Sequence, residues 1–352
     1  MKMKERGLIA LAAILATAPI SAQEVQRVSG RSVAIYNIAG HVEMVAGSGS
    51  EVVVRIARHG DDADRLRVET GEIRGRETVR IVYPAREVVY PEMGRGSSTT
   101  TRVRDDGTFS DSGLRRGDQV RVRGSGRGLE AWADLVIEVP RGQEIHVYLA
   151  VGTVEARDVD GEIDIDTGSG AVSAEDMSGS LSIDTGSGAV AVTGMDGDLT
   201  VDTGSGSISV SDVVAGEVDL DTGSGRVVGR GIEARSLGVD TGSGSVDLER
   251  IRSADVTVDT GSGSVELELL TDIESLDIDT GSGSVTVWAP SNLGASLEID
   301  TGSGGIDVDF PVELRSARRD SMRGRLGDGR GRIVIDTGSG SIRLLRTRGV
   351  LR

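Results

Sequence analysis

Nine copies of the pentapeptide Asp-Thr-Gly-Ser-Gly (DTGSG) set the strongest constraint on the fold of this chain. The first eight copies follow one another at intervals of 18 to 21 residues, and the last comes 36 residues later. Apolar and polar residues alternate on both sides of each copy, a period that predicts two half-buried strands joined by a Gly-rich bend. The copies begin at Asp166, Asp184, Asp202, Asp221, Asp240, Asp259, Asp279, Asp300 and Asp336.

Several repeats carry one further apolar residue after the second strand, which predicts a short third side (Met177, Met195, Val213, Ile232 and Ile251). A single unit of this size cannot bury its own apolar face, but stacked units share a continuous core. We therefore predict an all-β fold, a parallel β-solenoid (β-helix) in which each repeat of about 19 residues is one rung. At about 4.8 Å a rung, nine rungs extend about 40 Å.

The remaining sequence divides around this array. Residues 1–22 combine basic residues with a short apolar run and Ser21-Ala22, the pattern of a signal peptide. We expect residues 23–144 to form an irregular β cap with a mobile loop at 91–128, which is rich in Gly, Ser, Thr, Arg and Asp. Residues 145–352 are expected to form the solenoid, interrupted at 316–332 by an Arg-rich insert.

Charge and composition exclude several classes of function. The chain has no Cys, which excludes disulfide scaffolds and thiolate metal sites. Residues 151–312 contain 32 Asp and Glu but only 6 Arg, whereas residues 313–352 contain 11 Arg and 4 acids. The acidic stretch should repel nucleic acid and attract cations or basic partners. We interpret the basic end as a charged edge that blocks aggregation, with contact to envelope phosphates as the alternative.

The sequence resembles the bacterial putative-adhesin domain family of unknown function, whose members are secreted β-solenoids with Gly-rich repeats. The resemblance rests on four segments and on the DTGSG array: 33–44, 47–54, Leu135–Gly142 with its Pro-Arg-Gly step, and Arg325–Gly329 followed by 333–344. It implies a secreted solenoid more strongly than any particular activity.

The DTGS string also matches the active-site loop of aspartic proteases, in which two aspartates share one proton. That chemistry needs one close pair in a cleft, whereas this chain repeats the motif nine times in a regular array. We therefore interpret DTGS as a turn, with Gly supplying the bend and the hydroxyls binding local backbone. A polysaccharide lyase or glycosidase remains as a weaker alternative, because no carboxylate pair stands apart from the repeat between residues 151 and 312.

Stacking should align the repeat aspartates in one column, where like charges repel one another. We expect either that these carboxylates cap the turns and are solvated, or that cations such as Ca²⁺ screen them. The candidate cation-binding column comprises Asp166, Asp184, Asp202, Asp221, Asp240, Asp259, Asp279 and Asp300. The neighbouring threonines should form an internal hydroxyl ladder, with an exposed ice-binding ladder as the alternative.

From these patterns we expect a non-catalytic, exported protein without a required cofactor. It would act as an adhesin or envelope-binding protein whose acidic face meets an envelope or surface partner, either protein or polysaccharide. The alternative is a periplasmic scaffold without an external ligand. The mature chain offers no second apolar stretch long enough to cross a membrane, so we expect it in the periplasm, at the cell surface or secreted.

Overall fold

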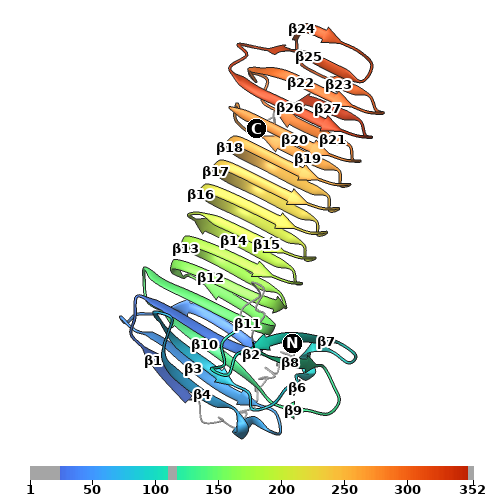
Figure 1. Ribbon diagram of the computed structural model, residues 1–352. Helices are drawn as coiled ribbons and strands as arrows, with labels where there is room; N and C mark the ends of the chain where they lie inside the picture. Colours follow the sequence, from blue (N-terminus) through green and yellow to red (C-terminus); the bar gives the residue numbers. More distant parts are fainter. Residues whose placement is uncertain (1–23, 110–116, 348–352) are drawn as a thin grey trace, which may run out of the picture.

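The computed structural model describes residues 24–109 and 117–347, which form a long stack of strands with a broader region at its N-terminal end (Figure 1). Apart from two short 3₁₀ turns, η1 (Ala63–Arg65) and η2 (Pro91–Met93), the regular structure of these residues is β-strand. The all-β prediction is therefore confirmed. The predicted signal peptide, 1–22, lies outside the described residues.

The N-terminal region is built around strands β2 and β3 of the large sheet. Strand β2 pairs in parallel with β5, β10 and β11, while β3 runs antiparallel to β1 and β10. A separate four-stranded sheet, in the order β7-β8-β6-β9, lies beside them. The strands are β1 (Glu24–Val28), β2 (Ser32–Ala46), β3 (Val52–His59), β4 (Arg67–Ile73), β5 (Arg76–Val82), β6 (Glu87–Val89), β7 (Ser98–Val103), β8 (Asp118–Arg123), β9 (Leu129–Glu130), β10 (Trp132–Val139) and β11 (Gln143–Arg157).

The segment 91–128 differs from the loop that we expected there. Its described residues include β7 and β8, which pair antiparallel. Val120 and Val122 of β8 are buried, so this strand has an apolar face. The low-complexity composition around it concealed that alternation from the sequence pattern.

Successive repeats pair in parallel, with equivalent positions opposite each other. Asp184 of one repeat pairs with Asp202 of the next, and Thr185 with Thr203. The strands of the stack are β12 (Asp160–Ser169), β13 (Val172–Thr185), β14 (Val190–Asp196), β15 (Leu199–Thr203), β16 (Ile208–Thr222), β17 (Val227–Thr241), β18 (Val246–Thr260), β19 (Val265–Leu269), β20 (Ser275–Thr280), β21 (Val285–Ala289), β22 (Ala295–Thr301), β23 (Ile306–Val308), β24 (Val312–Ala317), β25 (Ser321–Leu326), β26 (Gly331–Thr337) and β27 (Ile342–Arg346).

Alternation places the apolar side chains of every repeat in a shared core. In one repeat, Leu181, Ile183, Val190, Val192 and Met195 are each at most 3 % exposed. The residues of the predicted third side are buried with them. This core continues from the N-terminal strands to β27 as one hydrophobic cluster, so each repeat is stabilised by its neighbours.

At the C-terminal end, the spatial order of the repeats differs from their order in the chain. Strand β26, which carries Asp336, lies between β20 and β22, and β27 lies between β21 and β23. The last DTGSG copy is therefore inserted between the copies of Asp279 and Asp300. The Arg-rich insert does not simply precede a terminal rung, because its residues help to build a hairpin, β24–β25, that pairs antiparallel with β22 and closes the stack (Figure 1). After this hairpin the chain returns to the position beneath β22.

From Thr203 onward, the DTGSG threonines link neighbouring repeats from inside the core, whereas the buried hydroxyls of Thr167 and Thr185 do not form this bond. Every one of these threonines is fully buried. The Thr260 hydroxyl donates to the Gly244 carbonyl oxygen of the preceding repeat at 3.1 Å and accepts from the Gly263 amide of its own turn at 3.0 Å. The predicted internal hydroxyl ladder is thus confirmed, and the exposed ice-binding ladder is excluded.

The last Gly of each motif is fixed by the same close stacking. A Cβ at Gly225 would overlap the Gly206 carbonyl oxygen of the preceding repeat. Only Gly allows two turns to approach so closely while the threonine bridges them.

We predict that Thr260→Val lowers the free energy of unfolding by about 1 to 3 kcal/mol, because it leaves a buried amide and carbonyl without their hydroxyl partner. Chemical denaturation monitored by circular dichroism measures this loss. Thr257→Val is the matched control, since Thr257 is exposed in the same strand. Equal stability of the two variants would contradict the bridging role.

Candidate functional site

The repeat aspartates form one column along the stack, which we call the acidic column. Parallel register aligns each aspartate with the next, and Asp336 lies between Asp279 and Asp300. Asp166 is half-buried and the others are exposed. In spatial order the column comprises Asp166, Asp184, Asp202, Asp221, Asp240, Asp259, Asp279, Asp336 and Asp300. The structure thus brings together all eight predicted residues and adds a ninth.

Uncharged residues take the place of aspartate at both ends of the column. At the N-terminal end the same register position is occupied by Tyr148 on β11 and then by Tyr36 on β2. At the C-terminal end it is occupied by Ser321 of the capping hairpin. Continuous negative charge is therefore confined to the repeats between these two caps.

Threonine hydroxyls cap the turns of the central repeats, where we had expected the aspartates to do so. In the central repeats, the amide of the last Gly binds the threonine hydroxyl, as Gly225 does with Thr222 at 2.9 Å and Gly244 with Thr241 at 3.0 Å. Threonine rather than aspartate supplies this cap because its side chain points inward, whereas the aspartate beside it points outward. The carboxylates of the central repeats consequently face solvent.

Partial burial, together with the alignment of these carboxylates, makes their ionisation unfavourable. Partial burial, followed by repulsion from Asp202, Asp240 and Asp219, raises the pKa of Asp221. Burial, Glu217 and the neighbouring column residues likewise raise the pKa of Asp219, which lies on the same face. The column therefore carries unrelieved negative charge near its middle, which favours binding of cations or basic groups.

His146 joins the N-terminal end of this face to a carboxylate pair. Its Nδ1 lies 2.9 Å from Asp164 Oδ2, and its Nε2 lies 3.1 Å from Glu144 Oε1. Desolvation is the largest influence on the His146 pKa and lowers it, but the hydrogen bonds to Asp164 and Glu144 outweigh it and raise the pKa overall. The imidazolium form therefore bridges two strands of adjacent rungs.

The described residues contain no cluster of three or more His, Cys, Asp or Glu side chains arranged to hold a metal ion. The acidic column offers a row of single carboxylates rather than the cage of six to eight oxygens that Ca²⁺ prefers. Such a row suits cations that are shared between neighbouring carboxylates and water. Calcium binding at the column stays a prediction.

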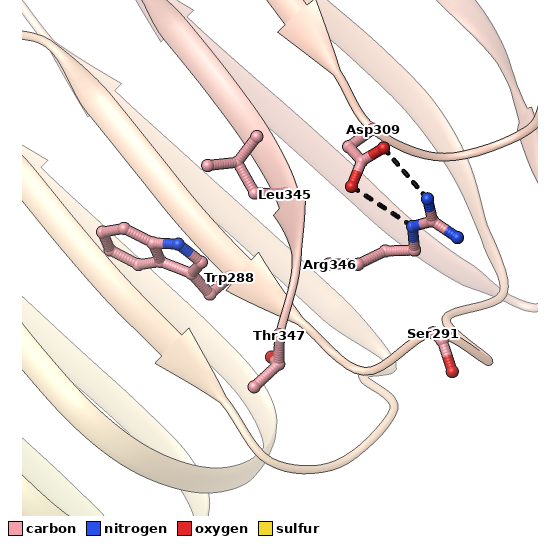
Figure 2. A pocket seen from close by; sticks show the side chains of 6 residues that line it. All are labelled: Trp288, Ser291, Asp309, Leu345, Arg346 and Thr347. Carbon is pink, nitrogen blue, oxygen red and sulfur yellow. Dashed lines mark hydrogen bonds and ion pairs between the residues drawn. The ribbon is translucent and has the colours of Figure 1, made fainter. Parts of the chain in front are cut away.

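A cavity of about 530 Å³ lies near the C-terminal end of the stack, beside Trp288 (Figure 2). Arg346 projects toward it and pairs with Asp309, with Nη2 lying 3.0 Å from Oδ1. This hydrogen bond raises the pKa of Arg346. Because its cation already has a carboxylate partner, the cavity has less to offer a charged ligand than the acidic column.

Among the described residues, no helix combines the length and apolar character that crossing a bilayer requires.

We predict that Asp221→Asn stabilises the protein by on the order of 0.5 kcal/mol near neutral pH, since it removes cross-strand repulsion in an exposed, solvent-screened column. The folded-state pKa of Asp221 is raised above its ordinary value of 3.8, so the ionic penalty appears as the pH rises through that range. Thermal unfolding of both proteins across this range tests the effect. Asp196→Asn, at an exposed position on another side, is the control, and an advantage equal to that of Asp221→Asn would contradict the prediction.

The raised pKa of His146 predicts that His146→Gln destabilises the protein, and more strongly at low pH. Stabilisation by the imidazolium is complete below the ordinary pKa of 6.5 and is lost as the pH rises through the raised value. Wild type should therefore exceed the variant in melting temperature by more at about pH 5.5 than at about pH 8. A difference between the two proteins that does not change with pH would contradict this assignment.

Comparisons with known proteins show the family to which this chain is similar. The model of the family described as Toastrack DUF4097 matches residues 87–345, which confirms the resemblance inferred from the sequence. No curated protein matches. The crystal structure of a putative cell adhesion protein from Clostridium sporogenes ATCC 15579 aligns with 92 % of this chain and 99 % of that chain, at 10 % identity and a TM-score of 0.20. The chain belongs to the Toastrack DUF4097 family.

Proposed function

We propose that this chain is an exported, non-catalytic binding protein of the bacterial cell envelope, which presents its acidic column to a basic or cation-bearing partner. The observation that carries the proposal is the in-register alignment of nine carboxylates along one side of the stack. In this proposal each DTGSG repeat of about 19 residues is one rung of a solenoid. The N-terminal region and the β24–β25 hairpin are its caps.

The repetitive construction supports binding rather than catalysis. A catalytic carboxylate pair depends on one acid and one base in different environments, whereas the central aspartates share one environment from rung to rung. A regular charged column suits a partner that also repeats its charges, because each added contact then increases the total affinity. Envelope polysaccharides and basic protein segments both offer such repetition.

In this proposal calcium ions neutralise part of the column's charge and bridge it to the partner. Divalent cations placed along the acidic column would relieve the repulsion that, after burial, raises the pKa of Asp221. They would also bridge the column to anionic groups of an envelope polymer. Export relies on the signal-peptide pattern of residues 1–22.

The proposal predicts that the mature chain, residues 23–352, is retained on isolated cell envelopes in calcium and released by excess chelator. The triple variant Asp221→Asn, Asp240→Asn and Asp259→Asn should lose most of this retention, since it removes the centre of the acidic column. Co-sedimentation with washed envelopes measures bound protein.

A variant with an equal change of charge on other sides of the stack is the control: Glu233→Gln, Glu266→Gln and Asp307→Asn. All three residues are exposed, and this variant should bind as wild type does. Retention that resists chelator but is lost in the column variant would favour direct contact with a basic partner. Absence of retention in every condition would contradict the binding role and favour a periplasmic scaffold.

A further inference from the structure

A second candidate site lies where the N-terminal region meets the first two rungs. It is a cavity of about 260 Å³, which we call the junction pocket. This volume is below that of pockets for drug-sized ligands and suits a group of monosaccharide size. The pocket is lined by Tyr36, Ile73, Arg74, Arg76, Arg104, Thr108, Phe109 and Tyr148.

Aromatic rings form one side of the junction pocket. Tyr36 and Tyr148 occupy the register of the acidic column, and their rings stack at 4.6 Å with an interplanar angle of 5°. Phe109 contacts Tyr36 edge-on, with centroids 5.8 Å apart. Burial, the largest influence, raises the pKa of Tyr36 to about 12, so its hydroxyl stays protonated and can donate a hydrogen bond. At this point the carboxylates of the column are thus replaced by a stacked pair of uncharged phenol rings.

Three arginines supply positive charge to the junction pocket. Arg74 lies in the turn between β4 and β5, Arg76 is the first residue of β5, and Arg104 comes from the segment after β7. Among the described residues, none of the three has a carboxylate within ion-pair distance. Arg104 Nη1 donates to the Thr108 hydroxyl at 2.8 Å, and Arg76 lies close enough to Tyr148 to lower the pKa of that phenol. Planar guanidinium groups of this kind bind carboxylates in a bidentate manner.

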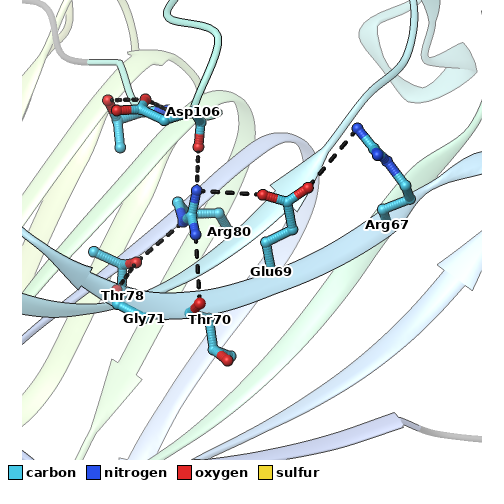
Figure 3. A network of polar contacts seen from close by, with 8 residues as sticks. Arg67, Glu69, Thr70, Gly71, Thr78, Arg80 and Asp106 are labelled. Carbon is cyan, nitrogen blue, oxygen red and sulfur yellow. Dashed lines mark hydrogen bonds and ion pairs between the residues drawn. The ribbon is translucent and has the colours of Figure 1, made fainter.

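A buried network holds one wall of the pocket in place (Figure 3). Arg80, whose side chain is 9 % exposed, donates to the Asp106 carbonyl oxygen and lies 3.4 Å from Glu69 Oε2. The Asp106 carboxylate accepts from the Thr108 amide at 3.0 Å and from its hydroxyl at 2.7 Å. These bonds fix the 104–108 turn against the β4–β5 hairpin. Arg104 and Phe109 are therefore positioned before any ligand arrives, which reduces the entropic cost of binding.

The acidic groups nearby limit the charge that a ligand can carry. Asp166 follows Tyr148 directly in the column, and Asp164 and Glu144 lie on the same face, joined to His146. A ligand with several negative charges would meet repulsion from these carboxylates. A single anionic group directed at the arginines avoids that repulsion.

We propose that the junction pocket binds one carboxylated sugar residue, a hexuronic acid, with its carboxylate on the arginines and its ring against the tyrosines. The stacked tyrosines offer ring edges for apolar contact and phenol hydroxyls for hydrogen bonds to the sugar, while the guanidinium groups select the charge. This site is separate from the acidic column and needs no calcium.

Galacturonate is the probe, titrated into the mature chain by isothermal calorimetry, with neutral galactose and inorganic phosphate as comparison ligands. Galacturonate should bind at least about tenfold more tightly than galactose, the difference that one charge-assisted contact supplies. Phosphate should bind more weakly than galacturonate because it gains nothing from the rings. Equal binding of galactose and galacturonate, or tighter binding of phosphate, would overturn the proposal, as would the absence of galacturonate binding.

Variants locate the site. Arg104→Gln and Arg76→Gln should each weaken galacturonate binding by about tenfold, and Tyr148→Leu should weaken galacturonate more than phosphate. Arg252→Gln, an exposed arginine of the third side, should leave binding unchanged. Unchanged affinity in Arg104→Gln and Arg76→Gln, with wild-type melting temperatures, would contradict the assignment. Because free sugar is the probe, this test is independent of envelope retention.

Discussion

The bridge between threonine hydroxyls and glycine turns is the interaction on which the rest of this structure depends. Each hydroxyl from Thr203 onward donates to the last Gly carbonyl of the preceding repeat, at distances of 2.8 to 3.3 Å. This bond requires a side chain that points inward and a Gly that lets the turns approach. Strict register follows, and register determines which side chains form columns. The acidic column is thus a consequence of the same packing that holds the core together.

Much of this arrangement could be predicted from the sequence, because the repeat acts through local spacing. Period-two alternation identified the buried positions, and the copies of DTGSG placed their aspartates in register. The insertion of Asp336 between Asp279 and Asp300 could not be predicted. Spacing shows that a repeat fits the stack, but identical repeats fit equally well at several positions. Only the capping hairpin decides which position the last copy takes.

The junction pocket also could not be predicted from the sequence, for a different reason. Its arginines and tyrosines come from segments up to about a hundred residues apart, which no local pattern connects. One signal was present: Tyr36 and Tyr148 each lie in an alternating apolar segment, at the position that aspartate takes in the DTGSG repeats. A column position that changes from aspartate to tyrosine only at the end of the array indicates that the repeats contact another part of the chain there.

The distribution of compensating charge supports a functional role for the middle of the acidic column. At the N-terminal end His146 bridges Glu144 and Asp164, and at the other end Arg332 lies 3.5 Å from Asp277 while Arg323 pairs with Glu298. Between them, the outward positions that precede the column residues from Asp202 to Asp259 are occupied by acids, hydroxyl residues or Gly. The same packing would tolerate asparagine at those exposed positions without repulsion. Aspartate at these positions gives a row of negative charge that the core does not need, and this row is the feature on which the proposed binding role rests.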